Sequence, residues 1–275
     1  MKLPQIIILF LLIACSSELF AQLNHKHFIT KGRLGLSEED YPEAIQNFNI
    51  AIIAKPNDFE AYFLRGIAKY SLNDFTGAVN DFTRTLDLHP LYVRAYHYRG
   101  ISNDQLGNYA DAKKDYNIAI KLDPYDPELH IALGSTKLHL NEFEDAIASF
   151  DTALIINPTN ANAYINRGVA KRFLNQLDEA VADLDKAVYY DFFNVEALVR
   201  RGIIQMEREK YKEAMLDFNN ALKLDSDNPI IYFNRGTVHL NMGDTVSALK
   251  DYERVNNLDE NNALTYFNRG IIYGQ

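Results

Sequence analysis

The sequence predicts an all-α fold, a solenoid of antiparallel helix pairs, from three regularities. Glycines recur every 34 residues without an insertion, at Gly32, Gly66, Gly100, Gly134, Gly168, Gly202, Gly236 and Gly270. Alanines follow twelve residues behind the first seven glycines, from Ala44 to Ala248. Apolar residues recur at i, i+4 spacing in both halves of each unit, which is the spacing of helices and not of strands. A fixed period of this kind marks a repeat architecture, in which each unit packs only on its neighbours.

Each unit divides into two helices joined by a turn. In the unit 59–92, the residues Asn73-Asp74-Phe75 interrupt the helical pattern and can cap a following helix. Pro90 ends the second helix, because proline disfavours helical geometry in the residue before it. Asn228-Pro229 places a capping residue before a proline at the first helical position of a later unit. The pattern predicts helices of about 12 to 14 residues.

The glycines inside the first helices predict a close approach between the two helices of a unit. Glycine in a helix costs roughly 0.5–1 kcal/mol relative to alanine, so something must offset that cost. With only a methyl group at the alanine, the two backbones can come together there. Aromatic residues four before the glycine are expected beside this contact, at Phe28, Tyr62, Tyr96, Tyr164, Tyr232 and Tyr266, with His130 and Leu198 in the fourth and sixth units.

The order aromatic, glycine, alanine, aromatic, proline resembles the tetratricopeptide repeat. The second aromatic position holds Phe48, Phe82, Tyr116, Phe150, Phe218 and Tyr252, with Leu184 in the fifth unit, and the proline position holds Phe192, Ser226 and Glu260 in the later units. The resemblance implies a right-handed solenoid within 22–275. Its repeats one to seven are 25–58, 59–92, 93–126, 127–160, 161–194, 195–228 and 229–262, followed by a single helix of an eighth unit at 263–275.

Two positions change together between the repeats, which predicts that they touch. An arginine before the glycine is accompanied by an aspartate sixteen residues later, in Arg65 with Asp81, Arg99 with Asp115, Arg167 with Asp183, Arg201 with Asp217, and Arg235 with Asp251. Repeat four has Leu133 with Ser149 instead, and repeat one has Lys31 with Asn47. We interpret these as structural ion pairs, since the partners satisfy each other. The alternative is a charged ladder that recognises a ligand.

The N-terminus predicts export. Lys2 precedes an apolar run at 6–14, which is typical of a signal peptide (1–21) and too short for a membrane span. Cleavage after Ala21 gives a periplasmic or extracellular protein, whereas lipidation of Cys15 gives a lipid-anchored envelope lipoprotein. Cys15 is the only cysteine, so no disulfide can form within the chain.

Neither an enzyme nor a nucleic-acid-binding protein is expected. The net charge is −9, with no basic stripe. The seven histidines lack metal-ligand spacing, and no phosphate loop or nucleophile elbow is present, so we expect no catalytic residue, metal site or cofactor.

The family resemblance implies that the first helices line a groove for an extended peptide or a partner protein. Apolar residues occupy much of this face, Val199 and Ile203 among them. The residues predicted to hold the partner are Phe63, Tyr70, His97, Phe173 and Phe233. The alternative is that these residues pack between neighbouring repeats.

The sequence thus predicts a non-catalytic protein-interaction scaffold of the cell envelope. One alternative is a structural module that self-associates through its C-terminal end. The other is the repeat part of a larger sensor or enzyme that continues beyond residue 275.

Overall fold

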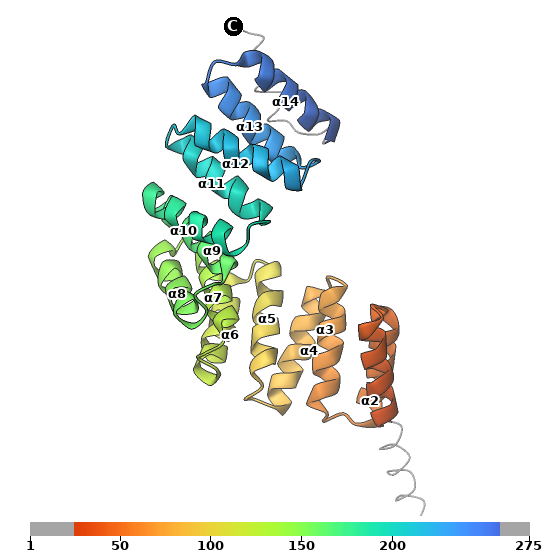
Figure 1. Cartoon of the computed structure of the whole chain (residues 1–275). Helices are drawn as coiled ribbons and strands as arrows, with labels where there is room; N and C mark the ends of the chain where they lie inside the picture. The colour runs from red at the N-terminus through yellow and green to blue at the C-terminus, as the bar shows by residue number, and fades with distance from the viewer. Residues whose placement is uncertain (1–24, 259–275) are drawn as a thin grey trace, which may run out of the picture. The chain divides into compact units, whose positions relative to one another are not determined.

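The computed structural model describes residues 25–258, which are helical and contain no strand. Residues 25–37 form the first helix. The helices that follow are α2 (Tyr41–Ala54), α3 (Phe59–Ser71), α4 (Phe75–Leu88), α5 (Val93–Gln105), α6 (Tyr109–Leu122), α7 (Pro127–His139), α8 (Phe143–Ile156), α9 (Ala161–Phe173), α10 (Leu177–Tyr190), α11 (Val195–Glu207), α12 (Tyr211–Leu224), α13 (Pro229–Asn241) and α14 (Thr245–Leu258) (Figure 1). The predicted signal peptide, Cys15 and the single helix at 263–275 lie outside the described residues.

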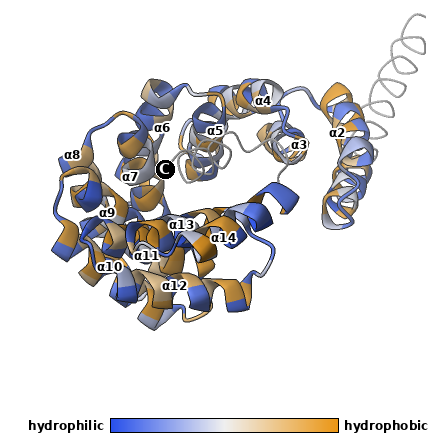
Figure 2. Cartoon of the chain, turned by 90° about the horizontal axis from the view of Figure 1, so that it is seen from above, coloured by the Kyte–Doolittle hydropathy of each residue, from blue (hydrophilic) through white to orange (hydrophobic). Residues whose placement is uncertain are grey.

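The predicted helix–turn–helix repeat is confirmed. From α3 onward the first helix of each repeat has 13 residues and the second has 14. Successive helices pack on one another, α3 on α4 and α5 on α6 in one part of the chain, α9 on α10, α11 on α12 and α13 on α14 in another. Each helix carries both apolar and polar residues (Figure 2), as expected for helices with one buried face. The protein is therefore an all-α solenoid of helix pairs.

Two structural units divide the chain, one ending at Thr136 and the other beginning at Lys137. The division falls within α7, so the helix pair of repeat four is split, whereas every other helix pair lies within one unit. The core of each unit consists of the repeated alanines and aromatic residues of the second helices, together with apolar residues of the first helices.

The helical glycines make room for an aromatic ring in most repeats. A Cβ atom added at Gly66 would lie 2.6 Å from the Phe82 ring, and one at Gly202 would lie 2.8 Å from the Phe218 ring. In repeat five, where Leu184 takes the aromatic position, the nearest atom is a backbone oxygen of the neighbouring helix at 3.2 Å. The expected approach of backbones thus holds at Gly168, whereas elsewhere the glycine accommodates a ring of the second helix.

The turn inside each repeat contains one residue with positive φ, again every 34 residues. These residues are Glu39, Asn73, Gly107, Asn141, Asn175, Glu209 and Gly243, with φ between 59° and 80°. In repeat two the amide of Asp74 donates to Lys69 O at 2.9 Å, which closes the helix C-terminus. Asp74 then caps α4 by accepting from the Gly77 amide, so the predicted cap is confirmed.

The turns between repeats keep their geometry where proline is missing. After α8, which precedes Pro158, the Asn160 amide donates to Asn157 O at 3.3 Å. After α10, which precedes Phe192, the Asn194 amide donates to Asp191 O at 3.2 Å. The replacement of proline by Phe192 therefore changes the side chain at this turn and not its hydrogen bonding.

Candidate functional site

All five predicted arginine–aspartate pairs are present as two-point ion pairs. In each, the arginine Nε and Nη2 donate to the two carboxylate oxygens at 2.5–3.0 Å. The aspartate side chains are buried and the guanidinium groups are mostly buried. The hydrogen bond to Asp251 raises the pKa of Arg235, which keeps that guanidinium charged.

Each arginine also reaches the preceding repeat, a contact that was not predicted from the sequence. Its Nη1 donates to the residue sixteen positions earlier, on the second helix of the previous repeat, at Asn49, Thr83, Asp151, Asp185 and Asn219. The distances are 2.5–3.1 Å. The only sequence signal was a polar residue at that position in each repeat. The arginine thus joins three helices and ties one repeat to the next.

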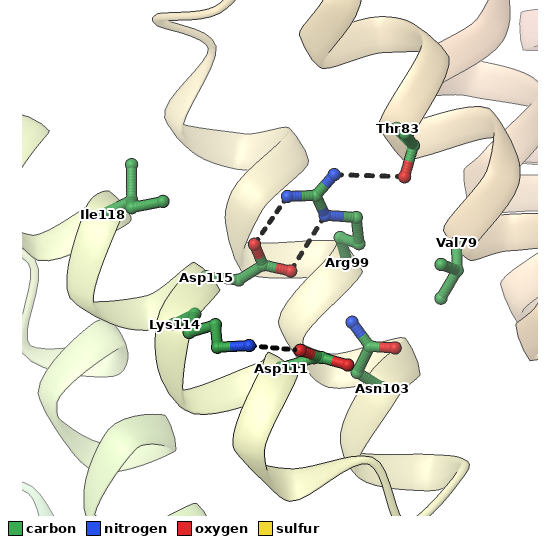
Figure 3. A pocket seen from close by; sticks show the side chains of 8 residues that line it. All are labelled: Val79, Thr83, Arg99, Asn103, Asp111, Lys114, Asp115 and Ile118. Atoms are coloured by element: carbon green, nitrogen blue, oxygen red, sulfur yellow. Dashed lines mark hydrogen bonds and ion pairs between the residues drawn. The ribbon is translucent and has the colours of Figure 1, made fainter.

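A polar cleft of about 350 Å³ lies beside one of these pairs, between α4 and α6 (Figure 3). Arg99 faces Asp115 on one side and Thr83 on the other. Lys114 donates to Asp111, three residues earlier on α6, at 2.8 Å, and both line the same cleft. Because the charged groups that line it already have partners, this geometry favours structural ion pairs over a ladder that recognises a charged ligand.

The aromatic residues four before each glycine lie at the repeat boundaries. The hydroxyls of Tyr62, Tyr164 and Tyr232 donate to the carbonyl oxygen six residues earlier, at 3.0–3.3 Å. His130 Nε2 lies 3.0 Å from the equivalent oxygen of Pro124. The guanidinium groups of the ion pairs lie over these rings in repeats two, three, five and seven, at 5.3–5.6 Å from the centroids. These rings therefore pack at the boundary between repeats and lie against the arginine of the ion pair.

Phe63 is not a groove residue, so this part of the prediction is wrong. Its side chain is 2% exposed and contacts the rings of Phe82, Tyr92 and Tyr98. The Arg94 guanidinium lies 5.0 Å from its ring centroid. In repeat two, the residue three before the glycine is therefore buried against the residues that follow. This is the alternative that the sequence left open, in which these residues pack between neighbouring repeats.

Tyr70 and His97 lie in a half-buried aromatic cluster of the first unit. Tyr98 contacts both, with ring centroids 6.2 Å from Tyr70 and 5.9 Å from His97. Burial raises the pKa of Tyr70 and lowers that of His97. Tyr116 lies 6.0 Å from His97 and donates its hydroxyl to Asp104 at 2.8 Å. These two predicted residues therefore have some accessible surface but are held by their neighbours.

Phe173 and Phe233 keep exposed surface in the second unit. Phe173 is 57% exposed and stacks on Phe143 with ring centroids 4.8 Å apart. Phe233 is half-buried and contacts Tyr252 at 5.9 Å. Both can contact a partner without a change in the core.

An open apolar cleft of about 480 Å³ lies between α11 and α13. Its lining residues are Val195, Glu196, Val199, Arg200, Ile203, Asp225, Asn228 and Ile230. Arg200 Nε donates to Glu196 Oε1 at 2.7 Å, which places an ion pair beside the apolar floor. Val199 and Ile203 were predicted on this face, but the residues predicted to hold the partner are the aromatic ones, so the cleft itself was not predicted.

Neither a metal site nor a membrane-spanning helix is found in the described part of the chain. Among residues 25–258, no group of three histidine, cysteine, aspartate or glutamate side chains could hold a metal ion. Within the same range, none of the helices combines the length and the apolar character that crossing a bilayer requires.

Helix pairs with a 34-residue period, linked from one repeat to the next by mostly buried arginines, are the architecture of a helical repeat protein. Sequence models of the tetratricopeptide repeat match residues 29–78, 63–127, 99–161, 149–182 and 230–262, and a further model of the TPR repeat matches 202–243. The chain belongs to the tetratricopeptide-repeat family. No curated protein matches it significantly.

Solved structures share this fold at low sequence identity. A tetratricopeptide repeat protein from Parabacteroides merdae has a TM-score of 0.74 and 17% identity, over 89% of this chain and 96% of its own. PilW, described as a widely conserved type IV pilus biogenesis factor, has a TM-score of 0.71 and 16% identity, over 76% and 97%. YrrB, a TPR protein with an unusual peptide-binding site, has a TM-score of 0.54 and 17% identity, over 69% and 97%.

Proposed function

We propose that this protein is a non-catalytic scaffold that binds an extended, apolar segment of another protein in the cleft between α11 and α13. The tetratricopeptide fold suggests a protein-interaction role, and the structurally similar YrrB is described as having a peptide-binding site. The cleft is the observation that carries the proposal. It combines an accessible aliphatic surface with polar groups at its edge.

The chemistry of the cleft defines the segment that it binds. Val199, Ile203 and Ile230 offer an aliphatic surface for one large apolar side chain. Burying such a side chain fully is worth roughly 1.5–3 kcal/mol. Glu196 and Arg200 at the edge can pair with polar groups of the bound segment, which fixes its direction more than its affinity.

A matched pair of variants tests the cleft. Ile230 in the cleft and Leu216 on the second helix α12 are both 60% exposed, so substitution of either leaves the core intact. Displayed twelve-residue peptides would be selected against the purified protein and their Kd measured by fluorescence anisotropy. We expect Ile230→Asp to weaken the selected apolar peptides at least about tenfold, which corresponds to about 1.4 kcal/mol, and Leu216→Asp to leave their Kd unchanged. Equal Kd values for the two variants would place binding elsewhere.

We also propose that the protein acts in the cell envelope after export. The support is the sequence of residues 1–21, with its apolar run and the small residue at Ala21. Intact mass of the protein from its native cells should show a mature chain that begins at Gln22. A chain that begins at Cys15 with added acyl groups would make it a lipid-anchored protein instead.

A further inference from the structure

A second cleft, of about 300 Å³, lies on the side of the second helices where repeats five and six meet. Val188 and Phe192 line it from the end of α10 and the turn after it. Leu198 and Arg201 line it from α11, and Asn220, Lys223 and Leu224 from α12. None of these residues lines the proposed peptide cleft between α11 and α13.

The cleft exists because Leu198 occupies a position that a ring fills in other repeats. In repeat five, Tyr164 donates its hydroxyl to Pro158 O at 3.2 Å, and the Arg167 guanidinium lies 5.3 Å from its ring centroid. Repeats two and seven have the same arrangement, and the histidine of repeat four keeps the contact to the carbonyl. Leu198 is shorter than tyrosine and has no donor. Space therefore remains beside Arg201, next to the turn that carries the carbonyl of Phe192.

A second departure from the repeat pattern shapes the same cleft. Phe192 replaces the proline of the earlier repeats, its side chain is 71% exposed, and it forms part of the cleft wall. Phe193 follows it with its ring at 5.6 Å. Both unusual residues of this boundary, Leu198 and Phe192, thus contribute to one cavity, which enlarges it and adds aromatic surface at its mouth.

We propose that this cleft binds a tyrosine side chain of a partner protein, with an acidic residue next to that tyrosine. The ring would lie against Arg201 and the phenol would donate to the Phe192 carbonyl, as tyrosine does within this chain at other boundaries. Lys223 supplies a positive charge that would pair with the acidic residue of the partner. It is exposed, donates to Asn220 Oδ1 at 3.0 Å, and forms no ion pair with a carboxylate among residues 25–258.

The direct test fills the cleft with a side chain of the protein itself. Leu198→Tyr should supply the missing ring and hydroxyl, so this variant should fold and melt at an equal or higher temperature than the wild type. The probe is N-acetyl-Tyr-Glu amide, titrated into the protein and followed by amide chemical shifts of α11 and α12. We expect saturable binding to the wild type at millimolar concentration and no saturable shift in Leu198→Tyr. A tyrosine placed at an exposed site elsewhere, in Leu216→Tyr, should leave binding unchanged.

Two further probes examine specificity. N-acetyl-Leu-Glu amide should bind at least about fivefold more weakly than the tyrosine probe. Lys223→Gln should weaken N-acetyl-Tyr-Glu amide, and should not change the binding of N-acetyl-Tyr-Gln amide.

Equal binding of the tyrosine and leucine probes, or unchanged binding to Leu198→Tyr, would overturn the proposal. So would sedimentation that shows wild-type dimers and Leu198→Tyr monomers without binding of the probe, since the occupant would then be a second copy of this chain.

Discussion

Removing the arginine of repeat three should destabilise the protein more than removing the equivalent arginine of repeat five. The aspartates that face the two arginines are equally buried, with side chains 5% exposed at Asp115 and 4% at Asp183. They differ in their second cation. Lys171 Nζ lies 2.7 Å from Asp183, whereas Asn103 stands at the corresponding position of repeat three.

The expected magnitudes follow from what each substitution leaves behind. Arg99→Leu leaves the buried Asp115 without its two-point partner, and breaking one side of a buried pair costs about 3–5 kcal/mol. Arg167→Leu leaves Lys171 in place, so we expect roughly half of that loss. Both substitutions also remove one contact to the preceding repeat, a hydrogen bond to Thr83 for Arg99 and an ion pair with the half-exposed Asp151 for Arg167. The Asp151 carboxylate stays solvated, so losing its ion pair costs less than about 1 kcal/mol and does not reverse the order of the two variants.

The double substitution Arg167→Leu with Asp183→Ser should recover most of the loss. Repeat four carries this combination naturally, with Leu133 and Ser149, and there Lys137 Nζ donates to Ser149 Oγ at 3.0 Å. Lys171 can make the same contact to a serine at 183. We therefore expect the double variant to lie within about 1 kcal/mol of the wild type, since replacing both sides of a buried pair is often nearly neutral.

Denaturant melts followed by circular dichroism would measure these differences. Because repeats can unfold in parts, hydrogen exchange of the amides in α5 and α6 against those in α9 and α10 would locate each loss. The reasoning fails if Arg99→Leu and Arg167→Leu cost the same, or if the double variant is as unstable as Arg167→Leu alone.

Three further predictions concern single residues. Glu209→Gly should stabilise the protein by about 1 kcal/mol, because Glu209 holds φ 59° and glycine adopts it without strain; an unchanged denaturation midpoint would contradict this. Burial lowers the pKa of His97, so the folded protein favours the neutral imidazole, and stability is lost as the pH falls below the unfolded pKa of about 6.5. The free energy of unfolding should therefore drop less between pH 7 and 5 in His97→Phe than in the wild type. Parallel pH profiles of the two proteins would refute this. Phe63→Ala should cost about 3–5 kcal/mol as a core truncation, whereas Phe173→Ala should cost less than about 1 kcal/mol, and equal losses in thermal melts would contradict their different burial.

The regular part of the fold was predictable because an unbroken period makes every repeat a copy of the others. The helix boundaries follow from the capping aspartate or asparagine and the terminating proline, and the joint change of arginine and aspartate indicated a contact. The third contact of each arginine was harder to predict, since its acceptor is asparagine, threonine or aspartate in different repeats. Amide, hydroxyl and carboxylate oxygens can all accept from the guanidinium, so no single residue type is required there.

The groove residues were only partly predictable for a geometric reason. Residues of a first helix that face the next repeat and residues that face solvent lie on neighbouring parts of the same helix surface. Phe63 is buried because Tyr92 and Tyr98 of the following segment close over it. Phe173 stays exposed because its one close ring, Phe143, covers a single face. The size of the neighbouring side chains decides which case holds, and that comes from packing and not from periodicity.

Repeats four and six show how a departure from the pattern can be interpreted within one chain. Repeat four replaces the boundary tyrosine by His130, and the imidazole still lies 3.0 Å from the turn carbonyl. It also replaces the ion pair, and Lys137 with Ser149 supplies a hydrogen bond in its place. Repeat six replaces the same tyrosine by Leu198 and fills the space with no other side chain, so a cleft remains. Substitutions that are compensated preserve the packing between repeats, whereas an uncompensated one leaves an accessible cleft, which is why we propose a second binding site at Leu198.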